Sequence, residues 1–147
     1  MKKAIICSGY FNPLGSHHLE FFENAKEKAD MVIAVVNNDK QRELKGSLEF
    51  QDEDERLKII RGLRDVDIAY KSIDTDRTQI ETIKMLWQRY TEDAGIQLAF
   101  GNGGDQTNES IPETDICEAL GIELIDGLGP KVGSSSWTLK KLESQNQ

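Results

Sequence analysis

Hydrophobic residues along the chain fall into short continuous runs, separated by longer segments whose apolar positions recur with helical spacing. Continuous apolar runs of this length are typical of parallel strands that are buried on both faces. Apolar residues that alternate with polar ones, or that follow one another without interruption, over four to eight positions between polar turns predict a strand. The strands that the pattern predicts span residues 3–8, 31–36, 66–70, 97–100 and 122–125.

Helices are predicted between these runs. The segment 17–29 carries apolar residues on one face, and two further segments open with a capping box, Asp52 with Glu55 and Thr78 with Glu81. A fourth helix is expected from the Ser110 region to Leu120, where Gly121 ends it, and a last one near Trp137. The charged stretch 37–50 has no apolar period, so we expect it to be a long loop.

Strands that alternate with helices predict one α/β domain over residues 1–147, built on a Rossmann-like open parallel five-stranded sheet with helices on both faces. In such sheets, ligands bind beyond the carboxyl ends of the strands, where the strand order reverses. The loops after the first, fourth and fifth predicted strands are rich in glycine or serine. We therefore expect a ligand site where these three loops meet.

Composition narrows the classes of partner. The net charge of −8 disfavours nucleic acid and anionic membranes, which require a basic face. No apolar run approaches the roughly 20 residues that span a bilayer, and the apolar stretch near the start is too short for a signal peptide. Cys7 and Cys117 are expected to be buried, reduced thiols of a cytoplasmic protein.

The first glycine-containing loop ends in two adjacent histidines, His17 and His18, at the predicted start of a helix. Backbone N–H groups and the positive end of a helix favour an anion at such a place. Histidine adds a donor that is charged or neutral near pH 7. Adjacent histidines diverge on a helix and make a poor zinc motif, so no protein-bound metal is predicted.

From Gly9 onward the sequence resembles the nucleotidyltransferase superfamily that carries the loop G-x-F-[DN]-x-x-H-x-G-H, which includes the glycerol-3-phosphate and choline-phosphate cytidylyltransferases. Gly9, Phe11, Asn12 and His18 match that loop. Further matches follow in chain order, at Asp39, Lys45 and Arg56, in the loop GNGGD and in the tail SSSWTLKK. The resemblance runs through nearly the whole chain and implies the nucleotidyltransferase type of α/β phosphodiesterase fold.

The chain departs from the family pattern in the first loop. Gly15 stands where the family has its first histidine, and His17 stands where the family has glycine. In the family both histidines contact the nucleotide phosphates. Pro130 also replaces a basic residue that precedes the serines of the tail.

The resemblance implies transfer of a cytidylyl group from CTP to a small phosphorylated alcohol or sugar, with release of pyrophosphate and with Mg²⁺ bound to the nucleotide. It also implies a homodimer. The catalytic residues implied are His18, Lys45 and Lys140. The substrate-binding residues implied are Asp39 and Arg56. The nucleotide-binding residues implied are Gly9, Tyr10, Phe11, Asn12, Gly15, His17, Gly101, Asn102, Gly103, Asp105, Ser134, Ser135 and Ser136.

Three alternatives stay open. In the first, the protein is an adenylyltransferase that uses ATP. In the second, it is a nucleotide-binding protein whose turnover is impaired by Gly15 and Pro130. In the third, it is an unrelated flavodoxin-like or stress-type nucleotide binder. Individual residues also have structural alternatives. In these alternatives, His17 is a solvent-facing residue of a first helical turn, Lys45 belongs to a solvated loop, and the three serines only cap a helix.

Overall fold

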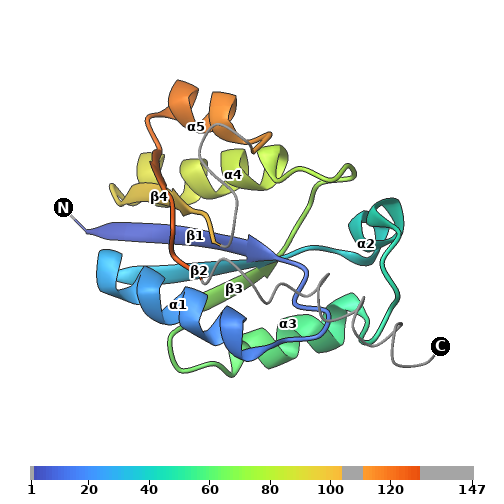
Figure 1. Ribbon diagram of the computed structural model, residues 1–147. Coiled ribbons are helices and arrows are strands. Elements are labelled where there is room, and N and C mark those ends of the chain that lie inside the picture. Colours follow the sequence, from blue (N-terminus) through green and yellow to red (C-terminus); the bar gives the residue numbers. More distant parts are fainter. Residues whose placement is uncertain (1, 104–110, 130–147) are drawn as a thin grey trace.

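The computed structural model describes residues 2–103 and 111–129 of the chain (Figure 1). Five parallel strands form one sheet, as the sequence predicts, and their order in it is β3-β2-β1-β4-β5. The strands are β1 (Lys3–Gly9), β2 (Met31–Val36), β3 (Ile68–Lys71), β4 (Gln97–Gly101) and β5 (Glu123–Ile125). The strand order reverses beside β1, because β2 lies on one side of it and β4 on the other.

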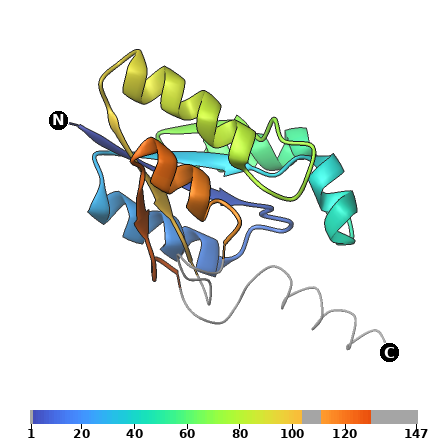
Figure 2. The ribbon, with the colours of Figure 1, turned by 90° about the horizontal axis from the view of Figure 1, so that it is seen from above.

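Helices cover both faces of this sheet. Figure 1 shows α1 and α3 below the sheet and α4 and α5 above it, while Figure 2 looks down on the α4 and α5 side. The helices are α1 (Ser16–Lys28), α2 (Asp39–Lys45), α3 (Glu53–Arg61), α4 (Ile80–Leu86) with the π-helical segment η1 (Trp87–Glu92), and α5 (Thr114–Leu120). None of the helices within the described residues is long and apolar enough to cross a membrane.

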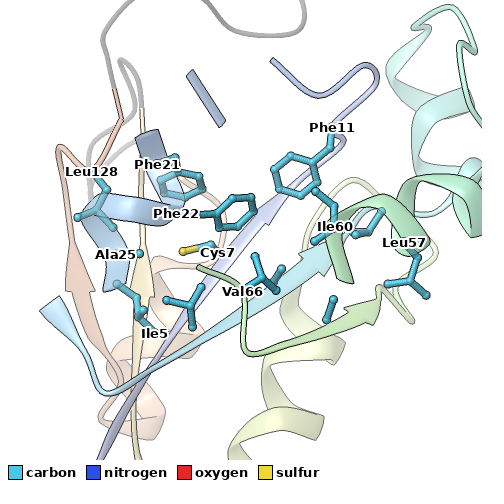
Figure 3. Close-up of a cluster of buried hydrophobic side chains, with 14 of the residues drawn as sticks. Ile5, Cys7, Phe11, Phe21, Phe22, Ala25, Leu57, Ile60, Val66 and Leu128 are labelled. Carbon is cyan, nitrogen blue, oxygen red and sulfur yellow. The ribbon is translucent and has the colours of Figure 1, made fainter. Parts of the chain in front are cut away.

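Alternate residues of each strand enter two separate hydrophobic layers. On β1, Ile5 and Cys7 point to the α1 and α3 side, whereas Ala4 and Ile6 point to the α4 and α5 side. Phe11, Phe22 and Ile60 complete the first layer (Figure 3). Both layers are fully enclosed at β1 and β2, so the central strands are a rigid base for the loops at their carboxyl ends.

The prediction of a loop over residues 37–50 is wrong in part, because α2 occupies its centre. Asn38 caps this helix by accepting the N–H of Gln41 at 2.9 Å, and the Gln41 side chain accepts the Asn38 N–H at 3.0 Å. Gly46 ends it with a φ of 80°. The capping signal is present in the sequence, but Gln41 is the one buried residue of the helix, so no apolar period reveals it.

The capping box predicted at Thr78 and Glu81 is also wrong. The carboxylate of Asp74 accepts the N–H of Glu81 at 2.8 Å and that of Thr82 at 2.9 Å, so the cap of α4 comes from the preceding loop. Asp52 does cap α3, accepting the Glu55 N–H at 2.8 Å. The helix α5 begins at Thr114 and ends before Gly121, whose φ is 71°. The predicted helix near Trp137 lies outside the described residues.

Candidate functional site

The loop between β1 and α1 is shaped by Phe11. This residue has a φ of 51° and is almost fully buried. Its ring packs so closely on Gly9 that a Cβ there would lie 2.9 Å from Phe11 Cζ. The ring also lies 5.1 Å from the His18 ring, edge on, and 5.4 Å from the Phe22 ring. Phe11 therefore fixes the path of the loop through its contact with Gly9, and it supports one edge of the His18 ring.

His18 is held in one orientation by the backbone of the same loop. Its Nδ1 accepts the N–H of Gly15 at 2.8 Å, so a neutral His18 carries its proton on Nε2. Burial, with smaller contributions from the neighbouring His17 and Lys45, lowers the pKa of His18 to about 3. His18 is therefore a neutral hydrogen-bond donor at the start of α1 at physiological pH.

His17 lies against both Gly15 and His18. The two imidazole rings are 3.9 Å apart between centroids and inclined by 44°. A Cβ on Gly15 would lie 2.7 Å from His17 Cε1 and 2.8 Å from its Nδ1, so the ring fills the space beside that glycine. Within the described residues the buried Nε2 of His17 has no hydrogen-bond partner. Burial lowers the pKa of His17 as well.

Lys45 brings a positive charge to this histidine pair from the last turn of α2. Its Nζ lies 4.3 Å from the centre of the Tyr10 ring, a cation–π arrangement. Burial lowers the pKa of Lys45, and the charge of Arg77 lowers it further. Lys45 makes no ion pair with any carboxylate of the described part of the chain. A partly desolvated cation of this kind favours an anionic ligand.

Asn12 joins the first loop to the segment that follows α2. Its side-chain N–H donates to the carbonyl of Leu48 at 2.6 Å, and its side-chain oxygen accepts the N–H groups of Phe50 at 3.0 Å and Gln51 at 3.3 Å. The side chain is nearly fully buried. It therefore positions the connection from α2 to α3, and its predicted contact with a nucleotide stays a prediction.

Arg56 and Asp39, both predicted to bind substrate, lie together. The guanidinium of Arg56 donates to the Asp39 carboxylate at 2.9 Å, to the Tyr10 carbonyl at 2.8 Å and to the Asn37 carbonyl at 2.6 Å. Its exposed fraction is 0%, so the guanidinium has no face open to a ligand in this structure. Arg56 holds the ends of β1 and β2 in place, and direct substrate contact stays a prediction.

The loop after β4 approaches the same edge of the sheet. Gly101 allows Leu128 to pack directly against β4, because a Cβ there would lie 2.6 Å from Leu128 Cδ1. Asn102 is buried, and its side chain donates to Asp126 at 3.2 Å. Gly103 lies over Phe21 of α1. Asp105, Ser134, Ser135, Ser136 and Lys140 lie outside the described residues.

The structure thus brings the first loop, the end of α2 and the loop after β4 to the carboxyl ends of the strands. Sequence reasoning missed the positioning role of Asn38 and Gln41, which tie α2 to the loop after β3. Asn38 donates to the carbonyls of Ser72 and Asp74 at 3.0 and 2.9 Å, and Gln41 donates to that of Thr78 at 2.9 Å. The Asn-x-x-Gln capping box was the one signal for them.

A metal site of the chain itself is not found in this arrangement. No three His, Cys, Asp or Glu side chains of residues 2–103 and 111–129 come together as ligands. The carboxylate of Asp39 is engaged with Arg56.

Curated relatives with detectable sequence similarity are longer proteins. The Bifunctional protein HldE of Geobacter metallireducens is 30% identical over 129 residues, which cover 84% of this chain and 24% of that protein. The Bifunctional protein HldE of Aliarcobacter butzleri is 26% identical over 149 residues, which cover 99% of this chain and 28% of that protein. The chain thus spans about a quarter of the length of these relatives.

Solved structures share the fold at lower sequence identity. A lipopolysaccharide core biosynthesis protein from Thermoplasma volcanium superposes with a TM-score of 0.64 at 19% identity, over 86% of this chain and 96% of that one. A putative nicotinate-nucleotide adenylyltransferase from Vibrio parahaemolyticus gives 0.63 at 15% identity, over 98% of this chain and 83% of that one.

A third neighbour was solved with ligands. It is a bifunctional NMN adenylyltransferase/ADP ribose pyrophosphatase from Francisella tularensis, complexed with AMP and a manganese ion. Its TM-score is 0.62 at 10% identity, over 98% of this chain and 42% of that one. These identities establish the fold alone.

The family comparison covers the described site. The model of the family described as Cytidylyltransferase-like matches residues 6–122, from within β1 to the residue before β5. This span contains the first loop with both histidines, α2 with Lys45, and the loop after β4. The resemblance seen in the sequence is therefore confirmed, and the chain belongs to the cytidylyltransferase-like family of nucleotidyltransferases.

Proposed function

We propose that the protein transfers a nucleotidyl group from a nucleoside triphosphate to a small phosphorylated acceptor. An oxygen of the acceptor phosphate forms a bond to the α-phosphorus, and the bond from that phosphorus to the bridging oxygen breaks. Pyrophosphate leaves with the electron pair. No protein nucleophile is needed, because the acceptor phosphate is already an anion, so catalysis consists of positioning and charge stabilisation.

The observation that carries this proposal is the fixed, neutral His18 beside the cation of Lys45. Because Gly15 N–H holds Nδ1, the proton on Nε2 is the donor assigned to the α-phosphate. Such a donor costs little reorganisation during the reaction, since its orientation is already set. Lys45, held over Tyr10, is assigned to the leaving pyrophosphate. Lys140, Asp105 and the serines of the tail are proposed from the resemblance.

The exchange of glycine and histidine between positions 15 and 17 favours a working enzyme over an impaired one. The His17 ring lies where a side chain on residue 15 would start, next to His18. Its buried Nε2 has no partner within the described residues, as expected for a group that meets a ligand. We propose that His17 supplies the second imidazole of the site.

Pyrophosphate release tests the proposal directly. CTP and ATP are each supplied with Mg²⁺ and a panel of phosphorylated alcohols and sugars, and wild type is compared with His18→Ala at matched folding by circular dichroism. We expect release that His18→Ala lowers about 10²-fold or more. Unchanged release in this variant would remove His18 from the mechanism, and nucleotide binding without release for every acceptor would favour the binding protein.

The same assay also determines whether the donor nucleotide is CTP or ATP. The family description favours CTP, whereas the names of two structural neighbours include adenylyltransferase, one of them given as putative and the other complexed with AMP and a manganese ion. We therefore propose CTP or ATP as the donor, bound with a divalent cation. A competition experiment with both nucleotides shows which of them the protein prefers. The homodimer and the cytoplasmic location stay predictions from the sequence.

A double exchange separates the working variant from the impaired one. Gly15→His with His17→Gly restores the family pattern of the loop. A large gain in rate would show that the natural loop is impaired, whereas a loss would support His17 as a functional replacement.

A further inference from the structure

Arg77 is exposed in the loop between β3 and α4, and the structure records no hydrogen bond, ion pair or ring contact between it and the described residues. Every other arginine of the chain makes at least one such contact. These arginines are Arg42, Arg56, Arg61, Arg64 and Arg89. An arginine without a partner in a chain of net charge −8 is a candidate for binding an anion from solution.

The two carboxylates closest to Arg77 in the chain are turned to other partners. Asp74 accepts the N–H groups of Glu81 and Thr82 at the start of α4. Asp76 accepts the N–H of Thr78 at 2.9 Å and its hydroxyl at 2.7 Å. The loop thus uses its acids to cap its own backbone and leaves the guanidinium without a carboxylate.

The loop that carries Arg77 is fixed next to Lys45 through α2. Gln41 is buried and donates to the carbonyl of Thr78 at 2.9 Å, one residue after Arg77. Lys45 follows Gln41 by one helical turn and lies on the same face of α2. The charge of Arg77 accordingly contributes to the lowered pKa of Lys45. The charges of Lys45 and Arg77 therefore interact, and neither side chain forms an ion pair with a carboxylate of the described residues.

Such a pair is unfavourable without an anion. Like charges repel, and the cost grows as the site loses water. A phosphate dianion offers several oxygens and reverses that cost, because lysine binds it as a point charge and arginine binds it with two parallel N–H groups. The chemistry of the pair therefore fits a phosphomonoester.

The topology indicates which substrate brings that phosphate. The strand order reverses between β1 and β4, so the nucleotide crevice lies there. Arg77 follows β3, the edge strand that lies on the other side of β1 from β4. Lys45 and His18 lie between the two. We propose that Arg77 binds the phosphate of the acceptor substrate, and that Lys45 stands between this phosphate and the leaving pyrophosphate to which it is assigned above. This assignment rests on the proposed nucleotidyl transfer.

Binding measurements on the full chain test the assignment without knowledge of the acceptor. The probe is inorganic phosphate, titrated at constant ionic strength in the presence of saturating CTP or ATP and followed by the rise in Tm. The variants are Arg77→Gln and the control Lys40→Gln, which removes one charge from an exposed position of α2. We expect Arg77→Gln to weaken phosphate binding about tenfold or more. Its nucleotide affinity, and both affinities of Lys40→Gln, should stay within about twofold.

Two results would overturn the assignment. One is equal phosphate affinity in wild type, Arg77→Gln and Lys40→Gln. The other is an equal loss of nucleotide and phosphate affinity in Arg77→Gln, which would place Arg77 at the nucleotide. If no form of the protein binds CTP or ATP, the proposed function fails, and the phosphate titration without nucleotide still decides whether Arg77 binds an anion. Arg77→Lys should recover part of the lost affinity, because it restores the charge without the paired donors.

Discussion

The imidazole of His17 lies over Gly15 and excludes any side chain from that position. A Cβ on residue 15 would stand 2.7 Å from His17 Cε1, and the same ring lies 3.9 Å from the ring of His18. The backbone of Gly15 is extended, with a φ of −124°, so alanine is allowed there by the backbone itself. Only the position of the His17 ring makes the glycine necessary.

Gly15→Ala should therefore act through His17. We expect the new methyl group to displace the ring and to lower the rate of pyrophosphate release about tenfold or more, toward the loss of one transition-state donor. Ser16→Ala, at an exposed position next in the chain, is the matched control and should change the rate little. In a His17→Ala background, Gly15→Ala should add no further loss. Independent, additive losses would show that the two residues do not act together.

The pH dependence of His18 gives a second prediction. Its pKa lies at about 3 in the folded protein, below the usual value of about 6.5. The unfolded chain therefore binds the proton more readily, so stability falls as pH drops from about 6.5 toward 3. Between pH 6 and 8 His18 stays neutral, and kcat/KM should show no rise or fall from its titration.

Urea unfolding at pH 7 and pH 5 measures this effect. His18→Asn places an acceptor near the Gly15 N–H without a titrating imidazole, so it should lose less stability between the two pH values than the wild type does. An equal loss in both proteins would show that His18 does not carry the acid sensitivity.

The sheet and its first loop were predictable because the physics is local. Parallel strands with both faces covered need continuous apolar runs, and β1 and β2 have them. The helix α2 was missed because it buries only the polar Gln41, whose partner Thr78 lies far along the chain. Hydrophobic periodicity contains no information about a helix held by polar contacts.

The orientation of the Arg56 side chain could not be predicted from the sequence for a related reason. A charged residue near a predicted site is expected to face a ligand, yet the carbonyls of Tyr10 and Asn37 close over this one. Those acceptors come from loops that meet only after the sheet has formed. Conversely, the prediction of an anion site at the first loop needs only the strand, the glycines and the histidines.

Arg56→Ala should destabilise the protein strongly. The change leaves the carbonyls of Tyr10 and Asn37 and the carboxylate of Asp39 without their buried donor. We expect a loss of about 3 kcal/mol in the free energy of unfolding, measured by urea titration. Arg61→Ala, at the exposed end of α3, should stay within about 0.5 kcal/mol. A small effect of Arg56→Ala would mean that the loops hold together without the guanidinium.

Lys45 and Tyr10 give a prediction that distinguishes their two roles. Lys45 is proposed to contact the substrate with its charge, and Tyr10 only to support Lys45. Lys45→Gln should lower pyrophosphate release about 10²-fold, because it removes a cation from the site assigned to the leaving group. Tyr10→Leu keeps the cation and removes only a cation–π contact worth about 0.5–1 kcal/mol, so its loss should stay below about tenfold. Lys40→Gln is the control for charge on the same helix. If Tyr10→Leu were as severe as Lys45→Gln, the ring would itself be needed by the substrate, and Lys45 would serve to hold Tyr10 in place.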